Sequence, residues 1–272
     1  MQRTHLMAVA VLVALVCLSE GCNIGEVREV SVSIDGGEGG EKVKGSGDVV
    51  SLELDFADFT QVELTHAARG IIVQGDEYRV VIRVDDNIID RLRVNDTTVR
   101  VEGNRTQLSD GTHSGEKLEI GLENNSYSNI AFDVEIAMPD FTDLGLIGAT
   151  HAEVSGFAVT HAVNFDIVGA SSLSGTINTG SLNCQLSGAS HLQLSGTGDD
   201  LVVRAVGASI LRLGDFVCQN ADIDFIGASH GTVHTQGTLD ARLTGASVLK
   251  YKGNPTLGKI STSGASVLQN AN

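Results

Sequence analysis

The stretch Phe165-Asp166-Ile167-Val168-Gly169-Ala170-Ser171 decides the fold of this chain, because its last three residues recur at nearly constant spacing. Successive glycines of the tripeptide are 21, 19, 19, 20, 18 and 19 residues apart. Such a period indicates a repeat architecture, in which each copy is one structural unit stacked on the next. The seven copies are Gly148-Ala149-Thr150, Gly169-Ala170-Ser171, Gly188-Ala189-Ser190, Gly207-Ala208-Ser209, Gly227-Ala228-Ser229, Gly245-Ala246-Ser247 and Gly264-Ala265-Ser266.

Apolar and polar residues alternate on both sides of the tripeptide. Cys184 and Leu186 stand four and two positions before Gly188, and Leu192 and Leu194 stand four and six positions after it. A period of two is the mark of a strand with one buried face. Each repeat is therefore predicted as strand, Gly-Ala-Ser corner, strand and Gly-rich turn. The second turn signals are Ser155-Gly156, Ser195-Gly196, Gly214-Asp215, Gln236-Gly237 and Lys252-Gly253.

A repeat of this length predicts an all-β parallel β-solenoid. It is too short for a crossover helix between parallel strands, because such a connection needs a dozen or more residues for itself. The strands must instead pair with their equivalents one repeat away, at about 4.8 Å. Glycine suits the corner because it tolerates positive φ, and alanine and serine are small enough to stack there. A β-sandwich is the alternative for tandem strands, but it gives no reason for one tripeptide to recur in register, so the solenoid is favoured. The sequence leaves open whether each coil has two or three strands.

Residues 1–21 are predicted to be a secretory signal. Arg3 supplies a positive start, and the apolar run from Leu6 to Leu18 is too short to span a membrane. Ser19-Glu20-Gly21 before Cys22 resembles the lipobox of bacterial lipoproteins, although Ser19 replaces the usual leucine. This resemblance implies that Cys22 carries lipid and, through Asn23 and the enterobacterial sorting pattern, that the protein reaches the outer membrane. Cleavage before Cys22 without lipidation is the alternative.

The rest of the chain divides into three parts. Residues 22–47 are acidic and rich in glycine, which predicts a flexible tether. Residues 48–140 lack the tripeptide and are interpreted as irregular coils that cap the solenoid, with a separate small β-domain as the alternative. Residues 141–272 are the regular solenoid. Within the irregular part, strands are predicted at 52–59, 62–64, 70–73, 78–84, 99–101, 117–122 and 130–137, and loops at 102–116 and 123–129.

The run Phe132–Ala149, in which Met138-Pro139-Asp140 leads into Gly148-Ala149, is similar to a known bacterial family. So are the earlier segments Phe59–Val62 and Gly70–Asp76. The family is a domain of unknown function called putative auto-transporter adhesin, head GIN domain, and the resemblance covers roughly residues 50–268. It implies a right-handed parallel β-helix on a secreted or lipid-anchored chain. It implies no established activity.

Of the four cysteines, Cys17 leaves with the signal and Cys22 is the lipidation candidate. Cys184 stands at an inward position and is interpreted as a small core residue. Cys218 falls at a different angular position on the coil. A disulfide between Cys184 and Cys218 is the alternative.

No residue cluster predicts a metal site, a cofactor or catalysis. His151, His191 and His230 follow the tripeptide in alternate repeats, roughly 10 Å apart at strand spacing. That separation is too large for shared ligation of one ion. Asp222 and Asp224 are predicted to point outward, but the tandem Gly-Gly-x-Gly-x-Asp pattern of calcium-binding repeats is missing from the sequence. The serines of the tripeptide are explained by corner packing.

A secreted or periplasmic polysaccharide-active enzyme, a lyase or hydrolase, is the alternative function, because parallel β-helices often host such enzymes. Their sites use aromatic platforms for sugar rings and clustered acids in a cleft. This chain has no Trp and three Tyr, and its repeat lengths vary by only three residues, which leaves no insertion to build a cleft.

The formal net charge of −16 opposes binding to nucleic acid or to an anionic membrane surface. We therefore predict a non-catalytic cell-envelope lipoprotein that acts as an adhesin-like structural or binding module. It is expected on the outer membrane, in the periplasm or at the cell surface, and to touch the membrane through its lipid only. Its partner is expected to be an envelope or surface component, either protein or glycan. The polar run Leu268–Asn272 leaves the last coil open, which predicts end-to-end self-association.

Overall fold

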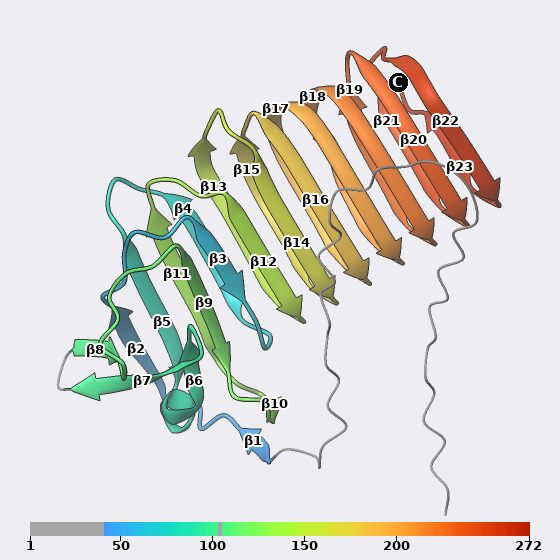
Figure 1. The fold of residues 1–272 in the computed structure, drawn as a ribbon. Coiled ribbons are helices and arrows are strands. Elements are labelled where there is room, and N and C mark those ends of the chain that lie inside the picture. Colours follow the sequence, from blue (N-terminus) through green and yellow to red (C-terminus); the bar gives the residue numbers. More distant parts are fainter. Residues whose placement is uncertain (1–40, 103–104) are drawn as a thin grey trace, which may run out of the picture. The chain divides into compact units, whose positions relative to one another are not determined.

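The computed structural model of the chain describes residues 41–102 and 105–272. Its strands wind into a solenoid of about seven turns, and most of them pair in parallel with the equivalent strand one coil away (Figure 1). This arrangement confirms the predicted all-β parallel solenoid. Among the residues described, no helix has the length and apolar character needed to cross a membrane.

The N-terminal part combines parallel and antiparallel pairing. β3 (Gln61–Leu64) pairs in parallel with β9 (Lys117–Leu122) and β12 (Asp143–Gly148). β4 (Arg69–Gln74) pairs in parallel with β11 (Phe132–Met138) and β13 (His151–Ala158), so this part is hydrogen-bonded directly to the regular coils. β5 runs antiparallel to β2 and β11, and β6, β7 and β8 form an antiparallel meander at the same end (Figure 1). The elements are β1 (Lys42–Lys44), β2 (Val49–Leu54), β3 (Gln61–Leu64), β4 (Arg69–Gln74), β5 (Arg79–Asp85), the 3-10 helix η1 (Asp86–Arg91), β6 (Leu92–Val94), β7 (Thr97–Glu102), β8 (Arg105–Leu108), β9 (Lys117–Leu122), β10 (Ser126–Ser128) and β11 (Phe132–Met138).

Three segments of this part differ from the sequence-based expectation. β8 lies within the predicted loop 102–116 because it pairs with β7, and β10 lies within the predicted loop 123–129 because it pairs with β1. β1 itself falls at the end of the predicted tether 22–47, where Val43 is buried; residues 22–40 lie outside the described residues. β1 and β10 are distant in the sequence, so local patterns do not reveal their pairing, whereas β7 and β8 follow each other in the chain and form a local antiparallel pair that the prediction missed.

The buried side chain of Asp85 holds this end together. Its Oδ1 accepts a hydrogen bond from the Gly47 N–H at 2.8 Å, and its Oδ2 accepts one from the Ala131 N–H, also at 2.8 Å. Asp85 is only 1 % exposed, so the carboxylate replaces water as the acceptor for two backbone donors.

Each regular coil has two extended runs, one before and one after the Gly-Ala-Ser corner. We call the stacked runs that precede the corners the pre-corner sheet, and those that follow them the post-corner sheet. β17 and β18 are continuous, so each supplies a post-corner run and then the next pre-corner run. The strands are β12 (Asp143–Gly148), β13 (His151–Ala158), β14 (Val163–Gly169), β15 (Ser172–Asn178), β16 (Ser181–Gly188), β17 (His191–Gly207), β18 (Ile210–Gly227), β19 (His230–Thr235), β20 (Thr238–Gly245), β21 (Val248–Lys252), β22 (Thr256–Gly264) and β23 (Val267–Asn270).

Three of the predicted second turns are not turns. At Ser155-Gly156, Ser195-Gly196 and Gly214-Asp215 the chain stays in the strand, and the pairing register shifts there. An extra residue in one strand changes which side chains point inward. After these shifts Phe157 and Phe216 are buried at 1 % and 0 % exposure, which gives the bulges a packing reason.

The corner glycines pair with one another from coil to coil, as predicted from their spacing. Gly207 has φ +109, and a Cβ there would stand 2.5 Å from the Gly188 carbonyl oxygen. That oxygen accepts a 2.8 Å hydrogen bond from the Ala208 N–H. Glycine is therefore required at position 207 for two reasons: its positive φ and the close approach of the Gly188 carbonyl oxygen in the preceding coil. Five of the six corner serines are buried, from Ser171 to Ser247; Ser190 Oγ lies 3.1 and 3.0 Å from the Ile167 and Ser187 carbonyl oxygens.

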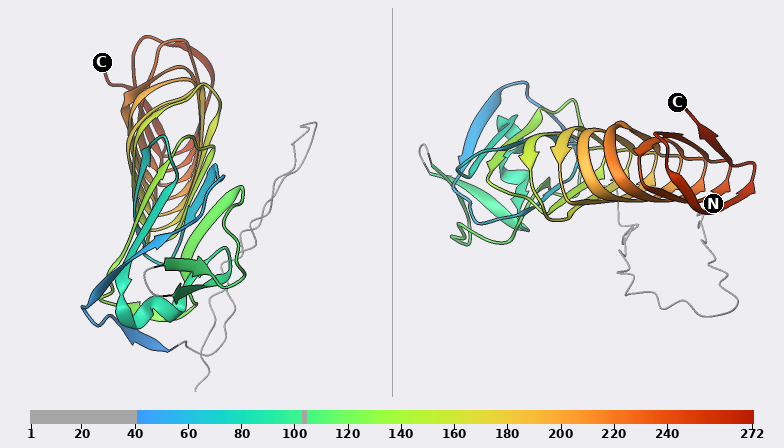
Figure 2. Two further views of the ribbon diagram at one scale, coloured as in Figure 1. Left: turned by 90° about the vertical axis from the view of Figure 1, so that its left-hand side faces the viewer. Right: turned by 90° about the horizontal axis from the view of Figure 1, so that it is seen from above.

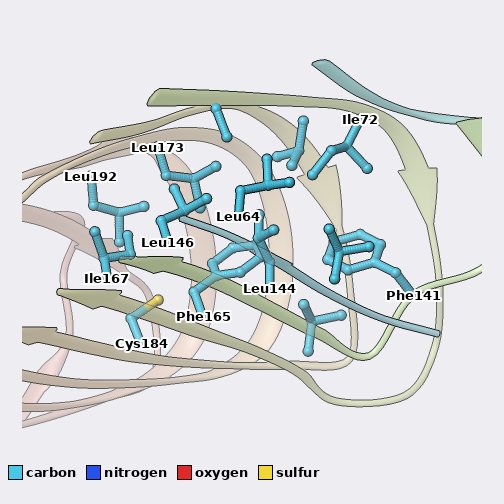
Figure 3. Packing of buried hydrophobic residues seen from close by; sticks show 14 of the residues in the cluster. Leu64, Ile72, Phe141, Leu144, Leu146, Phe165, Ile167, Leu173, Cys184 and Leu192 are labelled. Atoms are coloured by element: carbon cyan, nitrogen blue, oxygen red, sulfur yellow. The ribbon is translucent and has the colours of Figure 1, made fainter. Parts of the chain in front are cut away.

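Ladders of apolar side chains fill the space between the two sheets (Figure 3). The Phe141 ring packs edge-on against Phe157, with centroids 4.3 Å apart, and is stacked on Phe165 at 6.1 Å. Seen from above, the coils follow one another in a single row, with the N-terminal strands at one end and the last coil at the other (Figure 2). In the last coil Leu257 and Ile260 occupy inward columns but are 46 % and 38 % exposed, because no further described strand covers them.

Candidate functional site

The three predicted histidines lie in one outward column of the post-corner sheet. His151, His191 and His230 occupy alternate strands, separated by Ser172 and Ile210. Nowhere in residues 41–102 and 105–272 do three or more His, Cys, Asp or Glu side chains come close enough together to hold a metal ion. The column therefore offers separate polar groups rather than a ligand set.

A shallow depression crosses the post-corner sheet at β15, because Ser172 and Ser174 are small. One hollow of about 360 Å³ is bordered by His151, His191 and Arg212. A second hollow of about 440 Å³ continues toward β4; its lining includes Arg69, Ile71 and Glu153. The two hollows share His151, Ser172 and Ser174, so they form one continuous depression over the five neighbouring strands β4, β13, β15, β17 and β18.

The outward side of the pre-corner sheet carries Asp222 and Asp224, which point outward as predicted. Asp224 stands between Arg204 and Arg242 in one column. These residues line a hollow of about 220 Å³. Asp224 Oδ1 is buried and has no hydrogen-bond partner among the described residues, and the two flanking arginines are its nearest charged neighbours in that column.

A second pair of acids, which the sequence pattern does not single out, lies farther along the same column. Glu63 and Asp166 flank Gly145 on neighbouring strands, and Lys117 Nζ donates to Glu63 Oε2 at 2.8 Å. Partial desolvation, and then the charge of Glu63, raise the pKa of the Asp166 carboxyl. A carboxyl with a raised pKa beside a second carboxyl is one requirement of glycosidase chemistry. The aromatic platform is not supplied by phenylalanine, because all eight phenylalanines of the chain are buried in the core.

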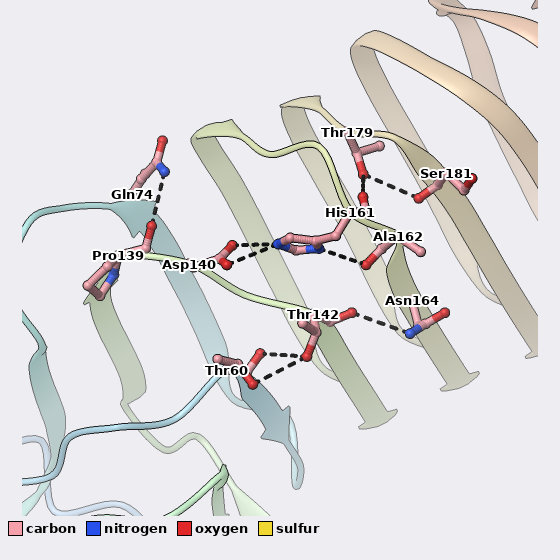
Figure 4. A network of polar contacts seen from close by, with 10 residues as sticks. All are labelled: Thr60, Gln74, Pro139, Asp140, Thr142, His161, Ala162, Asn164, Thr179 and Ser181. Atoms are coloured by element: carbon pink, nitrogen blue, oxygen red, sulfur yellow. Dashed lines mark hydrogen bonds and ion pairs between the residues drawn. The ribbon is translucent and has the colours of Figure 1, made fainter.

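A polar network links successive coils at the turns opposite the corners (Figure 4). His161 Nε2 lies 2.9 and 3.0 Å from the two carboxylate oxygens of Asp140, and its Nδ1 lies 3.0 Å from the Ala162 carbonyl oxygen. Both ring nitrogens thus face acceptors. The hydrogen bond to Ala162, followed by the Asp140 carboxylate, raises the pKa of His161 against the opposing effect of desolvation. Thr179 Oγ1 donates to the His161 carbonyl oxygen at 2.9 Å, so the network extends over a third coil.

The cysteines within the described chain are structural. Cys184 and Cys218 are both free and buried, so they do not form the alternative disulfide. Burial raises the pKa of both thiols, that of Cys218 to about 11, which keeps them protonated near neutral pH. The lipidation candidate Cys22 lies outside the described residues.

The fold and its surfaces define a repeat protein of the parallel β-solenoid class, with two broad outward faces and shallow depressions. The chain belongs to the family described as "Putative auto-transporter adhesin, head GIN domain", whose model matches residues 58–255. The resemblance carried by Phe132–Ala149 is therefore confirmed. A search of curated protein sequences gives no significant match.

Solved structures show the same fold. A putative adhesin from Bacteroides fragilis superposes with a TM-score of 0.72 at 17 % identity, covering 84 % of this chain and 100 % of that one. A putative lipid binding protein from Parabacteroides distasonis gives 0.63 at 18 % identity, with 85 % and 100 % covered. A putative adhesin from Parabacteroides merdae gives 0.61 at 14 % identity, with 85 % and 99 % covered. At these identities the similarity shows the fold and no more.

Proposed function

We propose that this chain is a non-catalytic, adhesin-like binding module of the cell envelope. The observation that carries the proposal is the pair of continuous outward faces, on which side-chain chemistry changes from coil to coil while the inward columns stay apolar. Solenoids use such extended surfaces to bind large partners. Membership of a family described as adhesins supports the same function.

The proposal includes export and attachment to the outer membrane through a lipid on Cys22. Its support is the signal-like segment 1–21 and the lipobox resemblance. Mass spectrometry of protein recovered from the envelope fraction of its own cells tests it, with Cys22→Ser as the control. We expect a mature N-terminus at Cys22 with acyl mass, lost in the variant. An unmodified chain in the medium would contradict the anchor.

Adhesion is tested with the mature chain carrying Cys22→Ser, which removes the lipid. We expect saturable binding to isolated envelope or surface material, without change in that material. The competing hypothesis is the polysaccharide-active enzyme, and the pair Glu63 and Asp166 is where it would act. Release of new sugar ends that disappears in Glu63→Gln and Asp166→Asn would establish the enzyme and overturn the binding module.

End-to-end self-association is also part of the proposal. β22 pairs with β20 and β23 with β21, and the remaining edges of β22 and β23 face no other described strand. Exposed strand edges with apolar side chains favour pairing with another chain. Light scattering across a concentration series is the test, and a monomer at the highest concentration would refute self-association.

A further inference from the structure

Charge is divided between the two faces of the solenoid, which the net charge of −16 conceals. The two central outward columns of the post-corner sheet, from β4 to β21, carry six basic side chains and a single acid, Glu153. The equivalent columns of the pre-corner sheet, from β3 to β20, carry six acids and two arginines. The basic residues are Arg69, His151, His191, Arg212, His230 and Lys250; the acids opposite are Glu63, Asp143, Asp166, Asp222, Asp224 and Asp240.

The arginines and the lysine of these two columns are not used for internal ion pairs. Arg69, Arg212 and Lys250 have no carboxylate within 4.0 Å among the described residues, and all three are exposed. In the N-terminal part, by contrast, Arg83 pairs with Glu135 and Arg91 with Glu41. Within the part of the chain that the structure describes, the one hydrogen-bond partner of the Arg212 guanidinium is Gln193, whose Oε1 lies 3.4 Å from Nη1. These charges are available to an external anion.

The spacing of these groups follows the solenoid axis. Arg69, His151, His191 and His230 share one column, while Arg212 and Lys250 stand in the next. From β4 to β21 there are six strand spacings, which span about 29 Å. The histidines recur every second strand, about 9.6 Å apart. Ser172, Ser174 and Gln193 supply neutral hydrogen-bonding groups, and the continuous depression lies between the first basic residues and Arg212.

We propose that the post-corner sheet binds a linear anionic polysaccharide, a polyuronate, laid along the solenoid axis. The proposal rests on the proposed function as a binding module and names its ligand class. A polyuronate combines widely spaced carboxylates with many hydroxyls, which matches cations separated by serine, threonine and glutamine side chains. The carboxylates bind Arg69, Arg212 and Lys250, and the hydroxyls bind the neutral groups between them.

A nucleic acid fits this face less well. One phosphate every 3.4 Å of each DNA strand calls for dense lysine and arginine. Single strands also call for aromatic side chains on which bases stack. The two central columns hold no Phe, Tyr or Trp, and only three of their side chains are arginine or lysine.

The test is calorimetric binding of a galacturonate hexamer to the mature Cys22→Ser chain, with a neutral galactose hexamer as the comparison sugar. We expect binding of the acidic sugar alone, weakened by added salt. The double variant Arg69→Gln/Arg212→Gln should lower affinity about tenfold or more, because it removes the charge-assisted hydrogen bonds from two guanidinium groups to the sugar carboxylates. Glu153→Gln should raise affinity by removing the one carboxylate that the two central columns carry between β4 and β21; Asp133 and Glu135 of β11 flank the β4 end of these columns.

The matched control is Arg204→Gln/Arg242→Gln, which makes the same charge change on the opposite face. It should alter affinity less than about twofold, as expected for distant exposed charges. Equal loss in both double variants, with unfolding temperatures unchanged, would overturn the assignment to the post-corner sheet. Tighter binding of a thymidine oligonucleotide, lost in Arg69→Gln/Arg212→Gln, would assign this face to nucleic acid instead. If the chain binds envelope material but not the galacturonate hexamer, the polyuronate inference fails while the proposed function stands.

Discussion

Substitution of the corner glycines should destabilise the protein to different degrees. Comparing Gly207→Ala with Gly148→Ala separates the effect of positive φ from the effect of close contact with the neighbouring coil. Both glycines have positive φ, +109 and +99. A Cβ on Gly207 would stand 2.5 Å from the Gly188 carbonyl oxygen, whereas a Cβ on Gly148 would find its nearest atom, the His66 nitrogen, at 3.8 Å. Gly148→Ala therefore tests backbone conformation alone, and Gly207→Ala adds a clash between coils.

The backbone conformation should cost each variant about 1–3 kcal/mol. In Gly207→Ala the two coils must also separate locally, which weakens the 2.8 Å hydrogen bond from the Ala208 N–H to the Gly188 oxygen. Losing that bond costs about 1 kcal/mol, and the disturbed packing adds to it. We expect Gly207→Ala to be less stable than Gly148→Ala by about 1–2 kcal/mol, or about 2–8 °C in Tm for a domain of this size.

Thermal and urea unfolding followed by circular dichroism measure the difference. Folded spectra at low temperature must be the same for both variants and the parent chain. Equal loss of stability in the two variants would show that the close approach of stacked glycines does not constrain the corner, and that conformation alone selects glycine there.

Three further predictions concern single side chains. Asp85→Ala should lower the free energy of unfolding by about 2–4 kcal/mol in a urea titration, because it removes two hydrogen bonds from the Gly47 and Ala131 N–H groups to a charged acceptor, and Asp85→Asn should cost less; a stability equal to the parent would refute this role. Asp140→Asn should lower the pKa of His161 in an NMR titration. Because the pKa of His161 is raised in the folded state, the His161–Asp140 pair stabilises the protein fully below the unfolded-state pKa of about 6.5 and loses its effect as pH rises through the folded-state pKa. The free energy of unfolding should change by no more than about 0.5 kcal/mol over this range, since the two side chains are 38 % and 46 % exposed. Cys184 and Cys218 should react with a thiol reagent at mildly alkaline pH only after unfolding, since both are buried with raised pKa values; rapid labelling of the native Cys22→Ser chain would contradict this packing.

The regular coils are largely predictable because their information is local and repeated. Gly169 and Leu173 stand at the same offset in each copy, so the spacing alone indicates which residues stack, and Cys184 and Leu192 are buried in the columns expected of them. The bulge near Ser195-Gly196 was not predictable, because a Ser-Gly dipeptide is equally typical of a turn and of a bulge within a strand. The decision comes from the neighbouring coil, where Phe216 must find a buried position.

The candidate surface shows the same division. The sequence reveals His151, His191 and His230 as a repeated position, but Arg69 lies outside the repeats and nothing nearby in the chain connects it to them. The pairing of β4 with β13 places Arg69 beside His151 and extends the basic column by one strand.

By itself, the sequence determined the β-solenoid class, the glycine corners, the inward columns and the family. In a chain with a constant repeat length, residues at the same offset in successive repeats stack on one another, so the spacing alone identifies them. Only the tertiary structure decided how the N-terminal strands close the first coil and which charges share a face. The physical reason is that β1 with β10, Asp85 with Ala131 and Arg69 with His151 are contacts between segments that share no period. Such contacts depend on the register and direction of pairing, which backbone hydrogen bonds and burial settle only when the whole chain has folded.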